Sequence, residues 1–306
     1  MAEHPIQGAE AAACDSSGIS VRIYLPDERL RSFATFYYFV ECTGPLSDFL
    51  YPEWGNVRFS TRGEWRAQLG RRYPEEPLIC TLFGATDRAA QVEQTVSTGG
   101  KTLGFGLTPL GWQRFLRTPA DELANRVVPL GDRFGVPDHD LLAQLAADDD
   151  DAAGVALFDR LLLDRLDHTK PNPGWAIELD AILRDRPASV EQFALNAALA
   201  ERSLARRCKQ LFGFNPKRVL RRQRFLDTLG KMRVMEQRHY NSLIDPEYFD
   251  QAHFVHEFRE FMGLSPTQFL SVPRPLMGKA AEAQVAAGIT LSFQLPPAPD
   301  EQEPAA

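Results

Sequence analysis

The first third of the chain contains short runs of β-branched and aromatic residues. Clusters of proline and glycine, such as Pro52 to Gly55 and Gly99-Gly100, separate these runs and interrupt regular structure. The spacing predicts strands of a small barrel or sandwich at Ile19–Tyr24, Phe33–Val40, Val57–Thr61, Leu78–Phe83 and Thr102–Leu107. We therefore expect a β-rich domain over residues 19–135.

After Thr108-Pro109 the apolar residues recur with helical spacing instead. Two stripes with a period near 3.6 residues are Leu141, Leu142 and Leu145, then Leu157, Phe158, Leu161, Leu162 and Leu166. They predict a helical linker region over residues 136–186. Beyond Val272 the chain is rich in alanine, proline and glutamate, and residues 273–306 are predicted to be a largely disordered tail.

Residues 204–220 and 254–270 repeat one pattern at an offset of 50 residues. The coinciding positions include Gly213 with Gly263, Pro216 with Pro266 and Leu220 with Leu270. Each copy predicts a helix that ends at a glycine in a left-handed turn, followed by a helix that begins with proline. One structural unit therefore occurs twice.

The residues before the first copy complete a recognisable motif. Ser189 to Gln192 has the form of a capping box, which predicts a short helix ending at about Leu195. The small residues 196–198 then turn the chain, and a second helix is predicted from about Glu201 to Phe212. A short helix, a tight turn and a second helix is the helix-turn-helix plan. Residues 187–272 are expected to form an all-α tandem helix-turn-helix domain.

The second helix of the first copy separates apolar from cationic side chains. Leu204, Cys208 and Leu211 form one stripe of the helical wheel, and Arg202, Arg206 and Lys209 cluster on the opposite side. Arginine can bond bidentately to guanine in the major groove of DNA. For a lone helix such cations would more often be a solvated surface, but the repeat and the basic helix that follows favour a DNA reader here.

The second copy carries less positive charge. Phe254, Phe258 and Phe261 form its packed stripe, and Asp250 is the expected N-cap. Glu257 and Glu260 are expected to repel phosphate.

Charge is distributed unevenly along the chain. The total is −7, which alone would argue against a nucleic-acid partner. Between residues 202 and 238, however, twelve Lys/Arg stand against two acids. Part of this cluster lies on a helix predicted from Pro216 to about Met232, which spans about 25 Å. Clustered cations are the electrostatic footprint of phosphate binding.

These motifs resemble a known family. Arg202 to Arg207 followed by Phe212 to Pro216, with Tyr248 to Phe254 and Gly263 to Pro266, is similar to the DNA-binding module of AraC/XylS-type bacterial transcriptional regulators. A looser likeness around residues 51–54 and 104–112 extends to the β-rich sensor domain of some members. The resemblance implies an α+β multidomain fold: a β-rich barrel or cupin-like N-terminal domain followed by an all-α tandem helix-turn-helix domain.

The resemblance also implies site residues. Carried over by position, the base-facing residues are Arg202, Ala205 and Arg206 in the first reader and Gln251, Ala252, His253 and His256 in the second. We add Ser203, Lys209, Lys217, Arg218 and Arg221 as predicted DNA contacts.

Several residues depart from the family pattern. Ala200 stands where a serine N-cap is usual, Glu247 where a turn glycine is expected, and His256 where arginine is frequent. Leu243 to Pro246 shortens the helix before the second reader. These departures predict that the first reader supplies most of the affinity and the second refines specificity.

The expected function is therefore sequence-specific, effector-responsive regulation of transcription. Double-stranded DNA is the expected partner, with RNA polymerase, a small-molecule effector and a second copy of the chain as further candidates. Glu53 and Arg58 are candidate polar anchors of an effector pocket, although exposure at the surface is the favoured interpretation for both.

Two alternatives remain open. One is a regulatory scaffold with degenerate readers that acts through protein contacts, and the other is a barrel enzyme. Against an enzyme, the β-rich region lacks histidine, a phosphate loop and a paired nucleophile, so no catalytic residue is assigned.

Cofactors and membranes are not expected. The four cysteines lie far apart, and no histidine occurs between His4 and His139, so neither a metal site nor a cofactor is predicted. No apolar run approaches 18 residues, and the polar N-terminus lacks the pattern of an export signal. A cytoplasmic protein without a membrane partner is expected.

Overall fold

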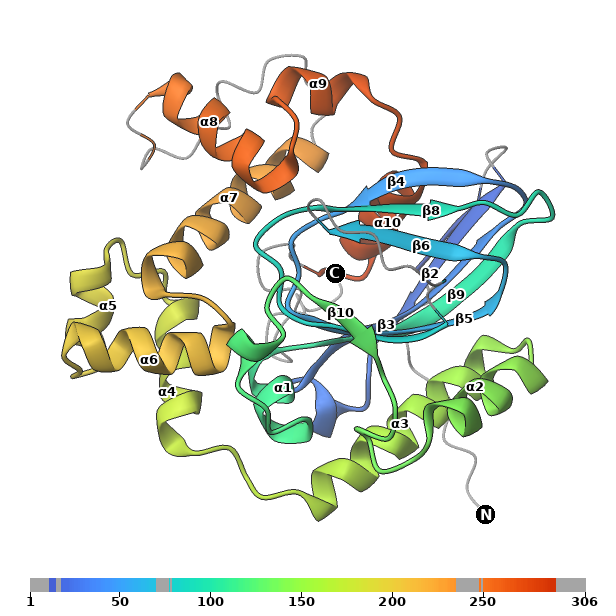
Figure 1. Ribbon diagram of the computed structural model, residues 1–306, viewed down its shortest axis with the longest axis horizontal. Helices are drawn as coiled ribbons and strands as arrows, with labels where there is room; N and C mark the ends of the chain where they lie inside the picture. The colour runs from blue at the N-terminus through green and yellow to red at the C-terminus, as the bar shows by residue number, and fades with distance from the viewer. Residues whose placement is uncertain are drawn as a thin grey trace, which may run out of the picture.

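The computed structural model describes residues 11–14, 18–69, 77, 79–234, 248 and 250–289. Its N-terminal part contains a seven-stranded antiparallel sheet with the order β1-β2-β3-β9-β5-β7-β10 (Figure 1). The strands are β1 Ala11–Cys14, β2 Ile19–Tyr24, β3 Ala34–Cys42, β5 Gly55–Arg62, β7 Cys80–Phe83, β9 Gly100–Leu107 and β10 Val127–Pro129. All five predicted strands lie in this sheet.

A second, three-stranded sheet with the order β4-β8-β6 lies over the first (Figure 1). Its strands are β4 Leu46–Leu50, β6 Trp65–Leu69 and β8 Ala90–Gln94. Trp65 and Val92 of this sheet pack into one apolar cluster with Val21 and Phe36 of the large sheet. Over the described residues the two sheets form a sandwich and do not close into a barrel.

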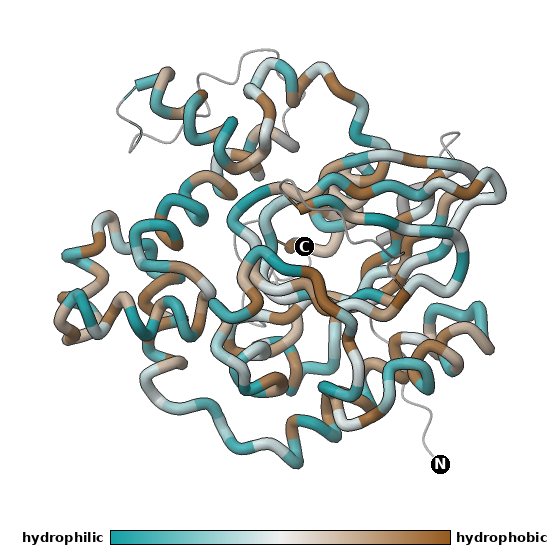
Figure 2. The backbone as a smooth tube through the Cα atoms, viewed as in Figure 1, coloured by the Kyte–Doolittle hydropathy of each residue, from teal (hydrophilic) through white to brown (hydrophobic). Residues whose placement is uncertain are grey.

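The other face of the large sheet is covered by helices α2 (Asp138–Ala147) and α3 (Asp151–His168). Phe158 of α3 lies within 5.2–5.3 Å of the rings of Tyr37 and Phe105, measured between centroids. Figure 2 shows the alternation of hydrophobic and hydrophilic positions along these helices that such packing requires. The prediction that residues 136–186 form a linker is therefore wrong for α2 and α3, because their apolar stripes belong to the core of the β-rich domain.

The remaining helices up to residue 271 form the C-terminal part. They are α4 Gly174–Arg184, α5 Val190–Asn196, α6 Glu201–Phe212, α7 Pro216–Val234, α8 Gln251–Met262 and α9 Pro266–Ser271. Helices α4 to α7 share an apolar cluster that also takes in Trp54, Ala85 and Leu110 of the β-rich domain. The short helix α1 (Pro109–Phe115) lies beside both α4 and α6. The two parts of the chain are thus packed against each other.

A further helix, α10 (Pro275–Ala286), lies within the segment predicted to be a disordered tail. That prediction is wrong for residues 275–289, because Leu276, Ala283 and Ile289 are buried in the cluster between the two sheets. The helix returns from the C-terminal part to contact β1, β2 and β4 (Figure 1). The rest of the predicted tail, residues 290–306, lies outside the described residues.

Candidate nucleic-acid interface

The repeat seen in the sequence is a repeat of structure. Helices α6 and α8 end at Gly213 and Gly263, whose φ angles of 83° and 74° lie in the left-handed region. Pro216 and Pro266 are the first residues of α7 and α9. The offset of 50 residues therefore holds at both ends of each unit, and the predicted repeat is confirmed.

The first helix-turn-helix unit is α5, a tight turn and α6. The Ser189 hydroxyl accepts a hydrogen bond from Gln192 N at 3.1 Å, so the predicted N-cap is confirmed. The Gln192 side chain accepts from Ala188 N instead of from the capping residue itself. In the turn, Ala198 adopts φ 48°, a left-handed conformation that costs most residues free energy. Ala200 begins α6 without any side-chain cap.

Helix α6 presents the two faces that the wheel predicted. Leu204, Cys208 and Leu211 are buried in the cluster shared with α4, α5 and α7. Arg202, Arg206 and Lys209 are exposed and make no ion pair with another described residue. Ser203 and Ala205 are half-buried between the two faces. The outer face of α6 is therefore a surface of cations that have no ion-pair partner in the described part of the chain.

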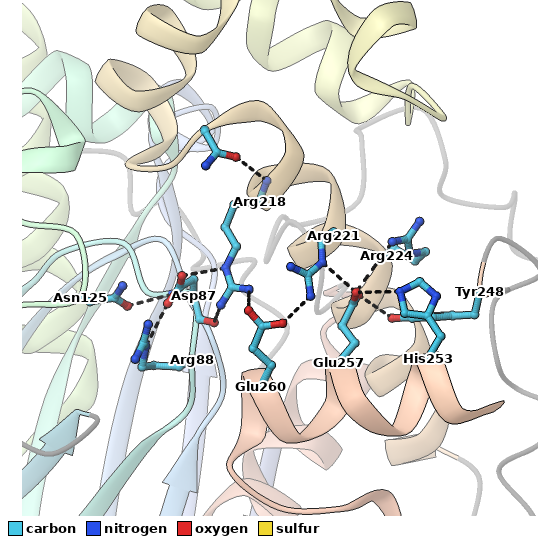
Figure 3. Close-up of polar contacts among 11 residues, drawn as sticks. Asp87, Arg88, Asn125, Arg218, Arg221, Arg224, Tyr248, His253, Glu257 and Glu260 are labelled. Atoms are coloured by element: carbon cyan, nitrogen blue, oxygen red, sulfur yellow. Dashed lines mark hydrogen bonds and ion pairs between the residues drawn. The ribbon is translucent and has the colours of Figure 1, made fainter. Parts of the chain in front are cut away.

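The basic residues of the linker helix α7 differ in exposure. Lys217 is exposed, but the side chains of Arg218 and Arg221 are only 13% and 24% exposed. Arg218 bonds to Asp87 Oδ2 at 2.7 Å and also to Glu260, while Arg221 bonds to Glu257 and Glu260 (Figure 3). In this conformation carboxylates of Asp87 and of α8 neutralise Arg218 and Arg221, so contact of these two residues with DNA stays a prediction.

The two acidic residues of α8 also differ from expectation. Glu257 is fully buried, where its carboxylate accepts hydrogen bonds from Arg221 Nε at 2.9 Å and from the Tyr248 hydroxyl at 3.0 Å. Glu260 lies between Arg218 and Arg221 (Figure 3). The expected repulsion between these carboxylates and phosphate is therefore compensated by internal ion pairs.

The second unit centres on α8. Asp250 accepts a hydrogen bond from His253 N at 2.7 Å, which confirms the predicted N-cap. Gln251, Ala252 and His256 are exposed. His253 is half-buried: its ring packs on Tyr248 and its Nε2 lies 3.8 Å from the Glu257 carboxylate. Of the four predicted base-facing residues on α8, His253 is thus the one that turns partly inward.

Residues 84–89, here called the interdomain loop, join β7 to β8 and contact α7 and α8. The loop's Thr86 carbonyl accepts from Arg222 Nε at 2.9 Å, and Ala89 N donates to Phe261 O at 2.6 Å. The Arg222 guanidinium also lies 3.8 Å above the Trp54 ring, and burial lowers the pKa of Arg222 to about 9. No feature of the sequence alone had singled out this loop.

A cavity of about 100 Å³ lies inside the β-rich domain, between the two sheets and helix α10. Its lining is mainly apolar, and its polar residues include Tyr38, Glu53, Asn56 and Arg58. The Glu53 and Arg58 side chains are only 10% and 11% exposed and are 2.5 Å apart. The favoured interpretation that both lie at the surface is therefore wrong: both are buried and line the cavity, and their role as anchors of an effector stays a prediction.

The family comparison bears on the C-terminal part. Residues 193–271 match the sequence model of a family described as "Helix-turn-helix domain". This range runs from α5 to the end of α9 and so covers both repeat units. The C-terminal module is an AraC-type helix-turn-helix domain. With this domain, the chain is a DNA-binding transcription regulator.

Solved structures show weaker likenesses, which cover different shares of the chain. ToxT from Vibrio cholerae is 8% identical, with a TM-score of 0.45, covering 78% of this chain and 98% of that one. The AraC-like transcriptional activator CuxR is 13% identical, with a TM-score of 0.28, covering 70% and 82%. A cupin protein from Ralstonia eutropha is 10% identical, with a TM-score of 0.25, covering 33% and 63%.

No curated protein matches the chain. The assignment of the AraC-type domain rests on the family match and on the repeat geometry. Within the described ranges, no three His, Cys, Asp or Glu side chains are grouped as metal ligands. None of the helices in the described part of the chain combines the length and apolar character that crossing a bilayer requires.

Proposed function

We propose that the chain regulates transcription by reading DNA mainly through α6, with α8 refining specificity. The observation that carries this proposal is the contrast between the two basic surfaces. Arg202, Arg206 and Lys209 on α6 are exposed and unpaired among the described residues, whereas Arg218 and Arg221 on α7 are held in ion pairs. The α6 surface therefore offers cations to a duplex without first breaking any ion pair with another described residue.

The proposed contacts follow from exposure on the two readers. On α6, Arg202 and Arg206 would contact bases, Ser203 and Ala205 would flank them, and Lys209 would contact phosphate. On α8, Gln251, Ala252 and His256 would face bases, with His253 at the margin. Lys217 would contact phosphate from the start of α7.

The length of the linker helix α7 supports binding of the two readers at two neighbouring major grooves of one duplex. Figure 1 shows α7 running between the first unit and α8. Its 19 residues correspond to about 28 Å, at 1.5 Å per residue. Successive major grooves on one face of a duplex are about 34 Å apart. Two readers held at the ends of such a rod suit neighbouring grooves.

The β-rich domain, completed by α2, α3 and α10, is proposed to bind a small-molecule effector in its cavity and to act by binding, not catalysis. RNA polymerase and a second copy of the chain are further proposed partners, and action on DNA would place the protein in the cytoplasm. The scaffold alternative was motivated by acidic residues on α8. Because Glu257 and Glu260 form ion pairs with α7, their negative charge no longer favours a scaffold over a DNA-binding regulator.

Selection of bound sequences from random duplex DNA by the purified full chain tests the proposal. We expect an enriched site with two conserved segments about one helical turn apart, the segment read by α6 being the stronger. Recovery of random sequence after repeated rounds would refute sequence-specific reading.

A further inference from the structure

Helix α10 forms one wall of the cavity of the β-rich domain and contacts β1 and β2 of the large sheet as well as β4 of the small sheet. Leu276, Met277, Ala280 and Gln284 of this helix line the cavity together with residues of both sheets. Val285 and Ala286, on the other side of α10, are exposed. One face of α10 therefore forms a wall of the cavity, and the opposite face meets solvent.

A buried carboxylate fixes the beginning of this wall. Asp48 of β4 is 2% exposed, and its Oδ2 accepts hydrogen bonds from the backbone nitrogens of Leu276 and Met277, both at 2.8 Å. A carboxylate at a helix N-terminus satisfies unpaired N–H groups and is favoured by the helix dipole. Asp48 therefore ties the beginning of α10 to the small sheet.

The same wall is joined to the second reader. Three residues, 272–274, separate the end of α9 from the start of α10. Phe269 of α9 lies 5.4 Å from the Phe258 ring of α8 and 6.0 Å from the Tyr51 ring, and Tyr51 lines the cavity. Met277 belongs to this same apolar cluster. A displacement of α10 would therefore act directly on the packing of α8 and α9.

Glu53 and Arg58 balance each other's charge at the polar end of the cavity, but one N–H donor group of Arg58 has no acceptor among the described residues. Arg58 donates through Nη2 to Glu53 and through Nε to the Tyr38 hydroxyl, which itself donates to Asn56 Oδ1 at 2.7 Å. Arg58 Nη1 is buried and has no hydrogen-bond partner among the residues that the structure describes. Because Glu53 already balances the guanidinium charge, a second carboxylate at this place would be repelled. An uncharged acceptor would satisfy Nη1 without that repulsion.

Size limits the ligand further. An engineered apolar cavity of about 150 Å³ holds benzene. The present cavity, at about 100 Å³, accepts a single ring or a short chain only with a slight outward shift of one wall.

We propose that the cavity binds an uncharged, mainly apolar molecule of about one ring with one hydrogen-bond acceptor at Arg58 Nη1, and that α10 transmits its binding to α8 and α9. This inference rests on the proposed function, since it assigns the effector class and the route of regulation. The bound molecule adds contacts to the closed arrangement. That arrangement keeps Arg218 and Arg221 in internal ion pairs, so ligand binding weakens DNA binding.

Three matched probes test the ligand class: acetophenone, benzoate and ethylbenzene, titrated calorimetrically into the full chain. Acetophenone should bind more tightly than ethylbenzene by about twofold to tenfold, the usual value of one hydrogen bond, and benzoate should bind weakest. In Arg58→Lys, which keeps the charge opposite Glu53 but removes Nη1, acetophenone and ethylbenzene should bind equally. Preference for benzoate, equal binding of the other two to the unmodified chain, or no binding of any probe overturns the proposal.

Two phenylalanine substitutions on α10 test the wall. Ala280→Phe fills the cavity and should abolish acetophenone binding, whereas Ala286→Phe, on the exposed side, should leave it unchanged. Ala280→Leu, a smaller change, should weaken acetophenone binding if Ala280→Phe does not fold. Equal acetophenone binding by Ala280→Leu and Ala286→Phe would overturn the assignment of this cavity.

DNA affinity measured with and without acetophenone tests the coupling between the cavity and the two readers. Saturating acetophenone should weaken binding of the selected duplex by about fivefold or more, the lower end of common allosteric coupling. Unchanged DNA affinity with acetophenone bound overturns the route through α10 while leaving the proposed function intact. Failure of the ligand-free chain to bind any duplex, by contrast, refutes the proposed function itself, whatever calorimetry shows for the cavity.

Discussion

Arg218 of the linker helix donates to the carboxylate of Asp87 in the interdomain loop at 2.7 Å, across 131 residues of sequence. The same guanidinium bonds to Glu260 of the second reader and lies 4.3 Å from the centre of the Phe261 ring. One side chain thus joins the β-rich domain, the linker and α8. The position of the AraC-type domain is tied to the domain that holds the cavity.

Releasing this link should increase affinity for DNA. In Asp87→Asn, Arg218 loses its charged partner in the interdomain loop and keeps only its ion pair with Glu260, which makes it more available to phosphate. We expect tighter binding to both specific and random duplex. We also expect the slope of log affinity against log salt to become steeper by about 0.9, the value of one added phosphate contact. Fluorescence anisotropy at several salt concentrations measures both quantities.

A matched variant separates this local effect from a general change in charge. Asp121→Asn removes the same charge from an exposed position in the β-rich domain. It should leave the salt slope unchanged. Equal steepening by both substitutions would show that the Asp87–Arg218 pair has no special role.

The same pair should make stability sensitive to acid. Burial would raise the pKa of Asp87, but Arg218 and Arg88 outweigh burial and hold that pKa below its ordinary value of 3.8. A carboxyl with a lowered pKa stabilises the fold above its unfolded pKa, and this stabilisation is lost as the pH falls through the folded pKa. The unfolding free energy of the wild type should therefore exceed that of Asp87→Asn near neutrality, and the two should converge below about pH 3.8.

Urea unfolding of both proteins across this range gives the comparison. Burial raises the pKa of Glu53 and of Asp48 in the folded chain, so these carboxyls have the opposite pH dependence. They are present in both proteins and cancel in the difference. A difference that stays constant from neutral pH into strong acid would contradict the ion-pair explanation.

The two readers differ at their N-caps, and this difference should appear in stability. Ala200→Ser supplies the side-chain acceptor that α6 lacks, and should stabilise the fold by about 1 kcal/mol. Asp250→Ala removes the existing cap of α8 and should destabilise by a similar amount, about 0.5–2 kcal/mol. Thermal unfolding of both variants measures the opposite shifts. A destabilised Ala200→Ser would show that the start of α6 cannot accommodate the hydroxyl.

Local patterns predicted the helical repeat closely. The glycine positions gave the C-terminal ends of α6 and α8, and the proline positions gave the starts of α7 and α9, because each residue type determines the backbone at its own position. The apolar stripe of α6 likewise identified its packed side. These features depend on neighbours within a few residues, which is the range that a sequence pattern reports.

Other features depended on distant partners or on weaker patterns. Strands β4, β6 and β8 were not predicted because Leu46–Leu50, Trp65–Leu69 and Ala90–Gln94 contain few β-branched residues, although their burial alternates. Helix α10 was missed because composition outweighed the helical spacing of Leu276, Ala280, Ala283 and Ala287. No local signal connects Arg218 with Asp87, since only the folded chain brings them together.

Base preference in Arg206→Ala tests the central claim most directly. The selected duplex and its single-base variants should be titrated with the wild type, with Arg206→Ala and with Lys217→Ala, whose exposed cation is a proposed phosphate contact. We predict that Arg206→Ala costs about 1–3 kcal/mol at the selected site and removes discrimination at one base position. Lys217→Ala should weaken all duplexes equally. Full base discrimination by Arg206→Ala would contradict reading of DNA by α6.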